Sequence, residues 1–126
     1  MKASFLLVGD PQSSWSLTLA RSLAPLGQLQ LIDEKEVNQK VLQRHYDLII
    51  VDAAIVKVVP LIKRVLAYTP EARIVVATLS PTWQRAREAL RAGAIGYIHR
   101  LQNEEELRST IKQFLQKPQS NNQEEV

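Results

Sequence analysis

Residues 46–52, Tyr46-Asp47-Leu48-Ile49-Ile50-Val51-Asp52, contain an unbroken apolar run enclosed by two carboxylates. A run of Leu, Ile and Val without polar alternation is typical of a strand buried on both faces, as inside a parallel sheet. Open α/β sheets place their ligands and their chemistry at the carboxyl ends of such strands. Asp52 is therefore the first candidate for a reactive side chain.

On both sides of this run, short apolar segments alternate with helical patterns. Strands are predicted at residues 4–8, 28–32, 47–51, 73–78 and 96–98. Capping residues and apolar spacing predict five helices. They run from Ser13 or Ser14 to about Leu26, after an Asp33–Glu36 capping box, to about Tyr68 with Pro60 in the first turn, from Ser80-Pro81 to Gly93, and after Asn103. This alternation implies right-handed crossovers and an α/β fold with a doubly wound, five-stranded parallel sheet, a (βα)5 flavodoxin-like arrangement.

Composition is consistent with one globular domain. The chain has 126 residues, of which 45% are hydrophobic and 23% charged. We assign residues 1–117 to the domain and expect the polar residues 118–126 to be a disordered tail or the start of a linker. The apolar runs are too short for a membrane span, and the N-terminus is too short for a signal peptide, so a cytoplasmic location is expected.

Charge and cysteine content exclude further classes of function. The absence of cysteine excludes disulfides and thiolate chemistry. The net charge is only +3, and no dense block of Lys and Arg marks a nucleic-acid face. Because no helix-turn-helix pattern remains once the five helices are assigned, we expect no direct binding of nucleic acid by this domain.

Polar residues follow four of the predicted strands. They are Asp10, Asp52, Thr78 and Arg100. The carboxyl ends of parallel strands meet at one edge of the sheet, so these four side chains are expected to converge there.

A longer motif lies in the last third of the chain, Ala89-Leu90-Arg91-Ala92-Gly93-Ala94-Ile95-Gly96-Tyr97-Ile98, followed by Glu106-Leu107 and Ile111. Together with the four strand-end residues, it resembles the response-regulator receiver (CheY-like) domain of the type attached to helix-turn-helix transcription factors. The resemblance extends from Lys2 to about Leu115. It implies a CheY-like fold and a role in two-component signal transduction rather than an enzyme activity.

The resemblance implies a role for each candidate residue. Asp52 matches the phosphoacceptor that takes a phosphoryl group from a histidine kinase or phosphotransfer protein. Asp10, together with Asp52, matches the ligands of Mg²⁺. Thr78 and Arg100 match the residues that bind the phosphoryl group, and Tyr97 matches the aromatic switch residue. A carboxylate nucleophile, a metal that neutralises phosphoryl oxygens and a fixed cation form a coherent site for phosphoryl transfer.

The resemblance also implies partners. A homodimer through the fourth helix, fifth strand and fifth helix is expected, as is a DNA-binding output domain beyond the C-terminal end of this chain.

Three departures from the family pattern bear on this interpretation. Gly9 stands where a second acid is usual, which should weaken or abolish Mg²⁺ binding. Arg100 replaces a lysine, and its planar guanidinium is not equivalent to the point charge of an ammonium group. Leu101 then follows where proline is usual. Residues 53–59 replace the usual Met-Pro and glycine-containing turn. These departures favour an alternative function, a pseudo-receiver that acts as an interaction or dimerisation module without phosphorylation.

Each candidate also has a structural interpretation. Asp52 could instead cap the next helix, and Asp10 could be an ordinary turn residue. Thr78 could be a β-branched strand residue without function, and Arg100 could be a solvated side chain. Tyr97 could be a packed core residue. A small-molecule-binding or catalytic α/β domain is a third class of function. The chain has no Gly-x-Gly-x-x-Gly and no Walker motif to support it.

Two tryptophans have separate expectations. Trp15 follows the turn after the first strand, so it is expected near the site. Trp83 and Leu90 share a helical spacing that is typical of the edge of a core. His45 and His99 have no companion ligands, so structural or surface roles are expected for both.

Overall fold

A computed structural model describes residues 2–79 and 82–116. The described chain forms one sheet of five parallel strands in the order β2-β1-β3-β4-β5. The strands are β1 (Ala3–Val8), β2 (Gly27–Ile32), β3 (Leu48–Asp52), β4 (Ile74–Thr78) and β5 (Gly96–His99). The predicted doubly wound parallel sheet is therefore confirmed, and β3, the apolar run between the two carboxylates, is its central strand.

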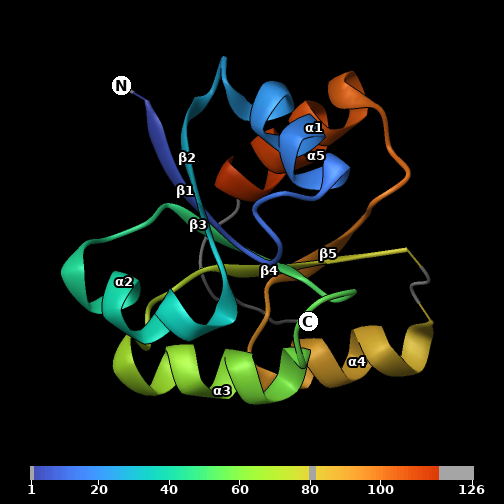
Figure 1. Cartoon of the computed structure of the whole chain (residues 1–126). Coiled ribbons are helices and arrows are strands. Elements are labelled where there is room, and N and C mark those ends of the chain that lie inside the picture. Colours follow the sequence, from blue (N-terminus) through green and yellow to red (C-terminus); the bar gives the residue numbers. More distant parts are fainter. Residues whose placement is uncertain (1, 80–81, 117–126) are drawn as a thin grey trace.

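Helices cover both faces of the sheet. They are α1 (Ser14–Leu23), the short 3-10 helix η1 (Glu34–Glu36), α2 (Val37–Gln43), α3 (Val58–Tyr68), α4 (Trp83–Ala92) and α5 (Glu104–Gln116). Helices α1 and α5 lie together on one face, and α2, α3 and α4 line the other (Figure 1). Alternate residues of β3 point into the two cores: Leu48 and Ile50 pack on the α1–α5 side, Ile49 and Val51 on the α2–α3–α4 side.

Several predicted helix ends are confirmed. Ser13 caps α1 through its side chain. Asn103 and Glu106 form a reciprocal capping box at α5, because each side chain accepts a hydrogen bond from the other residue's backbone N–H. The Asp33–Glu36 capping box is also present, but it opens η1 rather than α2 itself.

Other predicted ends are wrong. Helix α4 begins at Trp83, and its N-cap is Thr82, whose hydroxyl accepts from the Arg85 N–H. The predicted cap Ser80-Pro81 precedes this start and lies outside the described residues. Helix α3, in contrast, begins at Val58 and has Pro60 in its first turn, as predicted. Helix α1 ends at Leu23, before the predicted end at about Leu26, and Gly27 is the first residue of β2.

The expectation that Trp83 and Leu90 form a core edge is also wrong. Trp83 is 65% exposed and Leu90 46% exposed, and of the ten residues of α4, all of them described, only Ala89 is buried. The Arg87 guanidinium lies 5.4 Å from the centroid of the Trp83 ring and covers one of its faces. The helical spacing therefore marks a surface stripe and not a buried one.

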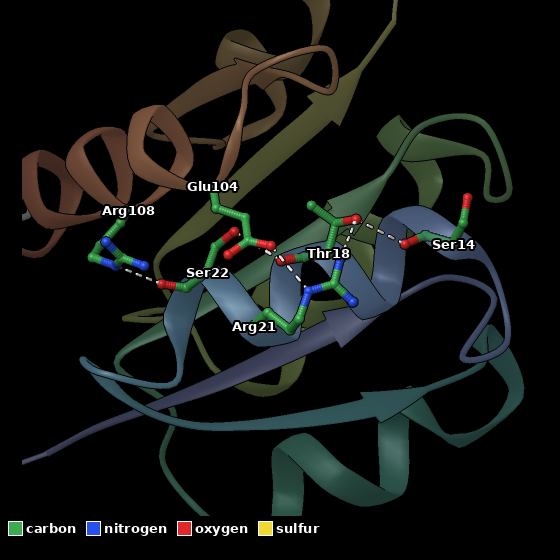
Figure 2. A network of polar contacts seen from close by, with 6 residues as sticks. All are labelled: Ser14, Thr18, Arg21, Ser22, Glu104 and Arg108. Atoms are coloured by element: carbon green, nitrogen blue, oxygen red, sulfur yellow. Dashed lines mark hydrogen bonds and ion pairs between the residues drawn. The ribbon is translucent and has the colours of Figure 1, made fainter.

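Polar contacts tie α1 to α5 (Figure 2). Arg21 Nε donates to Glu104 Oε2 at 2.9 Å, and Arg108 Nε donates to the Ser22 carbonyl at 2.9 Å. The side chains of Leu107, Ile111 and Phe114 pack in the core that the two helices share. Helix α5 is thus held by apolar packing and by hydrogen bonds at once.

None of the helices in the described part of the chain combines the length and the apolar character needed to cross a bilayer.

Candidate functional site

Asp52 is the last residue of the central strand, and its side chain is completely buried. Its Oδ1 accepts a hydrogen bond from the Ala54 N–H at 3.0 Å. The Asp52 carbonyl accepts from the N–H groups of Ile55 and Val56, each at 3.1 Å. The residues after β3 therefore form a tight turn on Asp52, which caps that turn rather than the next helix.

Arg100 covers the carboxylate. Its backbone N–H donates to the Thr78 carbonyl at 2.9 Å, which continues the pairing of β5 with β4 by one residue. Because β4 separates β5 from β3, the Arg100 side chain must cross the end of β4 to reach Asp52. Its Nη1 lies 3.5 Å from Asp52 Oδ1, and its side chain is 13% exposed. The predicted convergence of Asp52 and Arg100 is confirmed.

Trp15 completes this cluster from α1. The centroid of its ring lies 4.9 Å from Arg100 Cζ, and the residue is 7% exposed. The expected position of Trp15 near the site is confirmed. The sequence carries no signal for its contact with Arg100, because that contact joins the first helix to the residue after the last strand.

The other carboxylate oxygen, Asp52 Oδ2, is buried and has no hydrogen-bond partner within residues 2–79 and 82–116. Gly9 lies beside it, because Val8 pairs with Val51 in the register of β1 and β3. A Cβ at Gly9 would be 3.0 Å from Asp52 Cβ and 3.5 Å from Oδ2. An unpartnered buried carboxylate oxygen is costly, so Oδ2 is the atom at which a cation or a new covalent partner is most stabilising.

Asp10 lies in the turn after β1. Its carboxylate is exposed, and Oδ1 accepts from the Gln12 N–H at 3.0 Å, as in an ordinary Asx turn. The described residues contain no group of three or more His, Cys, Asp or Glu side chains arranged to hold a metal. Mg²⁺ binds through one or two carboxylates and keeps several waters. The two carboxylates predicted for it, Asp10 and Asp52, stand at the carboxyl ends of the neighbouring strands β1 and β3.

Thr78 and Tyr97 line one cavity of about 220 Å³ between the sheet and α4. Small aliphatic side chains form most of its wall, among them Ala53 and Val56 from the turn after Asp52 and Ala89 from α4. Tyr97 is 41% exposed, so the alternative of a packed core residue is wrong. The cavity joins the turn at the carboxylate to the helix that Tyr97 borders.

Neither histidine belongs to this cluster. His99 Nδ1 accepts from the Leu101 N–H at 3.1 Å, and His45 lies 3.9 Å from the Asp47 carboxylate at the opposite end of β3. The structural and surface roles expected for them agree with these contacts.

The chain is similar to known proteins in its fold but not in its sequence. No protein-family model matches the chain, and no curated protein has significant similarity to it. Among solved structures, the chemotaxis response regulator CheY4 of Vibrio cholerae is similar, with a TM-score of 0.80 at 20% identity over 90% of this chain and 99% of that one. A response regulator from Thermotoga maritima gives a TM-score of 0.78 at 18% identity over 91% and 99% of the two chains.

A longer protein, NtrX from Brucella abortus, gives a TM-score of 0.81 at 19% identity over 91% of this chain but only 27% of its own. At such low identities the likeness establishes the fold. The buried carboxylate at the end of the central strand agrees with this likeness. This protein has the fold of the response-regulator receiver domains, although its sequence differs widely from theirs.

Proposed function

We propose that this domain is a receiver module of two-component signal transduction and that Asp52 is its phosphoacceptor. The observation that carries the proposal is the state of Asp52 Oδ2, a buried carboxylate oxygen without a donor at the carboxyl end of the central strand. In the proposed step, Oδ2 attacks the phosphorus of a phosphohistidine or of a small acyl phosphate. The new O–P bond forms as the bond between phosphorus and the donor breaks, and the leaving group stays with the donor.

The neighbouring residues have complementary roles in this proposal. Arg100 is a fixed positive charge at Oδ1, and its buried Nε, which has no acceptor within the described chain, would donate to a phosphoryl oxygen. Thr78 at the end of the adjacent strand would donate its hydroxyl to the same group. Tyr97 would respond through the cavity that it shares with Thr78.

Asp10 and the Asp52 carboxylate would hold Mg²⁺, which when bound neutralises charge on the phosphoryl oxygens. Weak binding is expected, because Gly9 contributes no carboxylate.

The proposal includes partners and a location. A histidine kinase or phosphotransfer protein would donate the phosphoryl group, in the cytoplasm. The face formed by α4, β5 and α5 would bind a second copy of the domain, because Trp83, Leu90 and Tyr97 are exposed there. A DNA-binding output domain would lie beyond this chain.

Incubation with acetyl phosphate and Mg²⁺ tests the proposal by intact-mass measurement. We expect one phosphoryl adduct on the wild-type chain and none on Asp52→Asn, which keeps the size of the side chain but loses the nucleophile. Slow formation is expected, because Asp52 is fully buried and the turn must open first. If no adduct forms at saturating donor and Mg²⁺, the phosphoacceptor role is refuted.

A second function, the phosphorylation-independent pseudo-receiver, is favoured by one observation: Ala54 and Arg100 close Asp52 completely from solvent. It predicts that Asp52→Asn leaves the oligomeric state and partner binding unchanged. The same mass assay separates the two functions.

A further inference from the structure

The ion pair with Asp52 does not by itself fix the guanidinium of Arg100. The 3.5 Å between Nη1 and Oδ1 is longer than the roughly 2.7–2.9 Å of a charge-assisted hydrogen bond. Arg100 Nε has no acceptor within residues 2–79 and 82–116. The two-point fork contact that usually orients an arginine on a carboxylate is therefore not formed here.

The Trp15 ring supplies the missing constraint. The guanidinium lies 4.9 Å from the ring centroid, and both partners are almost completely buried, which strengthens a cation–π contact. A planar guanidinium can stack on an indole and at the same time present one edge to a carboxylate. Arg100 thus has Trp15 on its face and Asp52 at its Nη1 end.

We propose that Trp15 is a positioning residue: its ring holds the Arg100 guanidinium on Asp52. This stacking allows an arginine to act as the fixed cation of the site. The effect of Trp15 on phosphoryl transfer rests on the proposed function, whereas its effect on the Asp52–Arg100 contact does not. The chain also contains its own matched control, the stack of Arg87 on the exposed Trp83, at 5.4 Å and on another helix.

The test measures how strongly Asp52 and Arg100 depend on each other. Urea unfolding of Asp52→Asn, Arg100→Gln and the double variant gives their coupling, and the cycle is repeated in four backgrounds: wild type, Trp15→Phe, Trp15→Leu and Trp83→Leu. We expect equal coupling in the wild type, Trp15→Phe and Trp83→Leu, because an aromatic ring at position 15 is retained in each. In Trp15→Leu, which keeps an apolar side chain in the core, the coupling should fall to less than half.

A second measurement needs no variant at position 15. In the NMR spectrum of the wild-type protein, the side-chain methylene protons of Arg100, assigned with Arg100→Lys, should be shifted upfield by the indole ring current. Random-coil shifts for these protons, or undiminished coupling in Trp15→Leu, would overturn the inference.

The phosphorylation assay then separates the two proposals. An absent adduct in the wild type refutes the phosphoacceptor role alone, while the coupling and the ring-current shift still decide the role of Trp15. If the adduct forms, Trp15→Leu should slow its formation and Trp15→Phe should restore the rate. An unaltered rate in Trp15→Leu would count against the inference.

Discussion

Gly9 determines how much room the free oxygen of Asp52 has. A Cβ at this position would come within 3.0 Å of Asp52 Cβ, tighter than nearly all real contacts of its kind, so any side chain here forces a small shift of the carboxylate. An acid at this position would also bring a second negative charge close to Oδ2. The glycine therefore relieves crowding and repulsion around a buried charge, but it removes a potential metal ligand.

We expect Gly9→Asp to lower the stability of the metal-free domain and to raise its affinity for Mg²⁺. Without metal, the variant should unfold more easily than the wild type, because two carboxylates then repel each other in a poorly solvated place. Its affinity for Mg²⁺ should rise, since a third carboxylate joins the two proposed ligands, Asp10 and Asp52. At Mg²⁺ concentrations about 100 times the Kd, binding should return about 2.7 kcal/mol of stability. Isothermal titration and thermal unfolding with and without Mg²⁺ measure both effects.

Gly9→Ala is the matched control, because it adds the Cβ without the charge. It should show the crowding cost and no gain in Mg²⁺ affinity. Equal Mg²⁺ affinities for the two variants would show that position 9 does not border the proposed metal site.

Among the elements, α4 is the one that exposes apolar surface most openly. Trp83, Leu90 and Tyr97 line a shallow groove of about 590 Å³ together with Arg87 and Arg91. Only Ala89 of this helix is buried, so its outer side chains add little to the stability of the fold. Exposed aromatic and arginine side chains are the types that dominate protein interfaces, which fits the proposed self-association of this face.

Replacement of both Trp83 and Leu90 by alanine should weaken self-association while changing the free energy of unfolding by less than about 1 kcal/mol. Sedimentation over a range of protein concentrations measures the first effect and urea unfolding the second. Leu42→Ala is the control, because Leu42 is 63% exposed on α2, away from α4. If the double variant and the control associate like the wild type, this face is not the dimer surface.

Local chemistry explains which elements could be predicted. Ser13, Asn103 and the Asp33–Glu36 box lie next to the backbone groups that they cap, so the sequence contains the whole interaction. At α4 the N-cap is Thr82, two residues after the predicted cap, because more than one capping residue stands in this stretch and local sequence does not distinguish between them.

The site is predictable only in part. Parallel topology brings Asp52 and Arg100 to one edge, as expected. The stack of Arg100 on Trp15 and the unpartnered Oδ2 depend on side-chain packing between α1, β3 and β5, which no local pattern encodes.

At the scale of the whole molecule, the two helical layers are held unequally. On one face, Arg108 and Arg21 bind α5 and α1 together, and α5 buries Leu107, Ile111 and Phe114. On the other face, α4 buries Ala89 alone and borders the 220 Å³ cavity. Elements with few buried apolar contacts open at a low cost in free energy. The structural change proposed at Asp52 would therefore be transmitted through α4 while α5 stays in place.

Hydrogen exchange followed by mass spectrometry tests this asymmetry. Amides of α4 should exchange faster than those of α5 in the wild type, because α4 opens without global unfolding. Arg108→Ala removes the hydrogen bond to the Ser22 carbonyl, which at about 1 kcal/mol should speed exchange in α5 by roughly fivefold and leave α4 unchanged. Arg91→Ala on the exposed side of α4 is the control and should not affect α5. Equal protection of the two helices, or a response of α4 to Arg108→Ala, would mean that the layers open together and that α4 is not an independent switch.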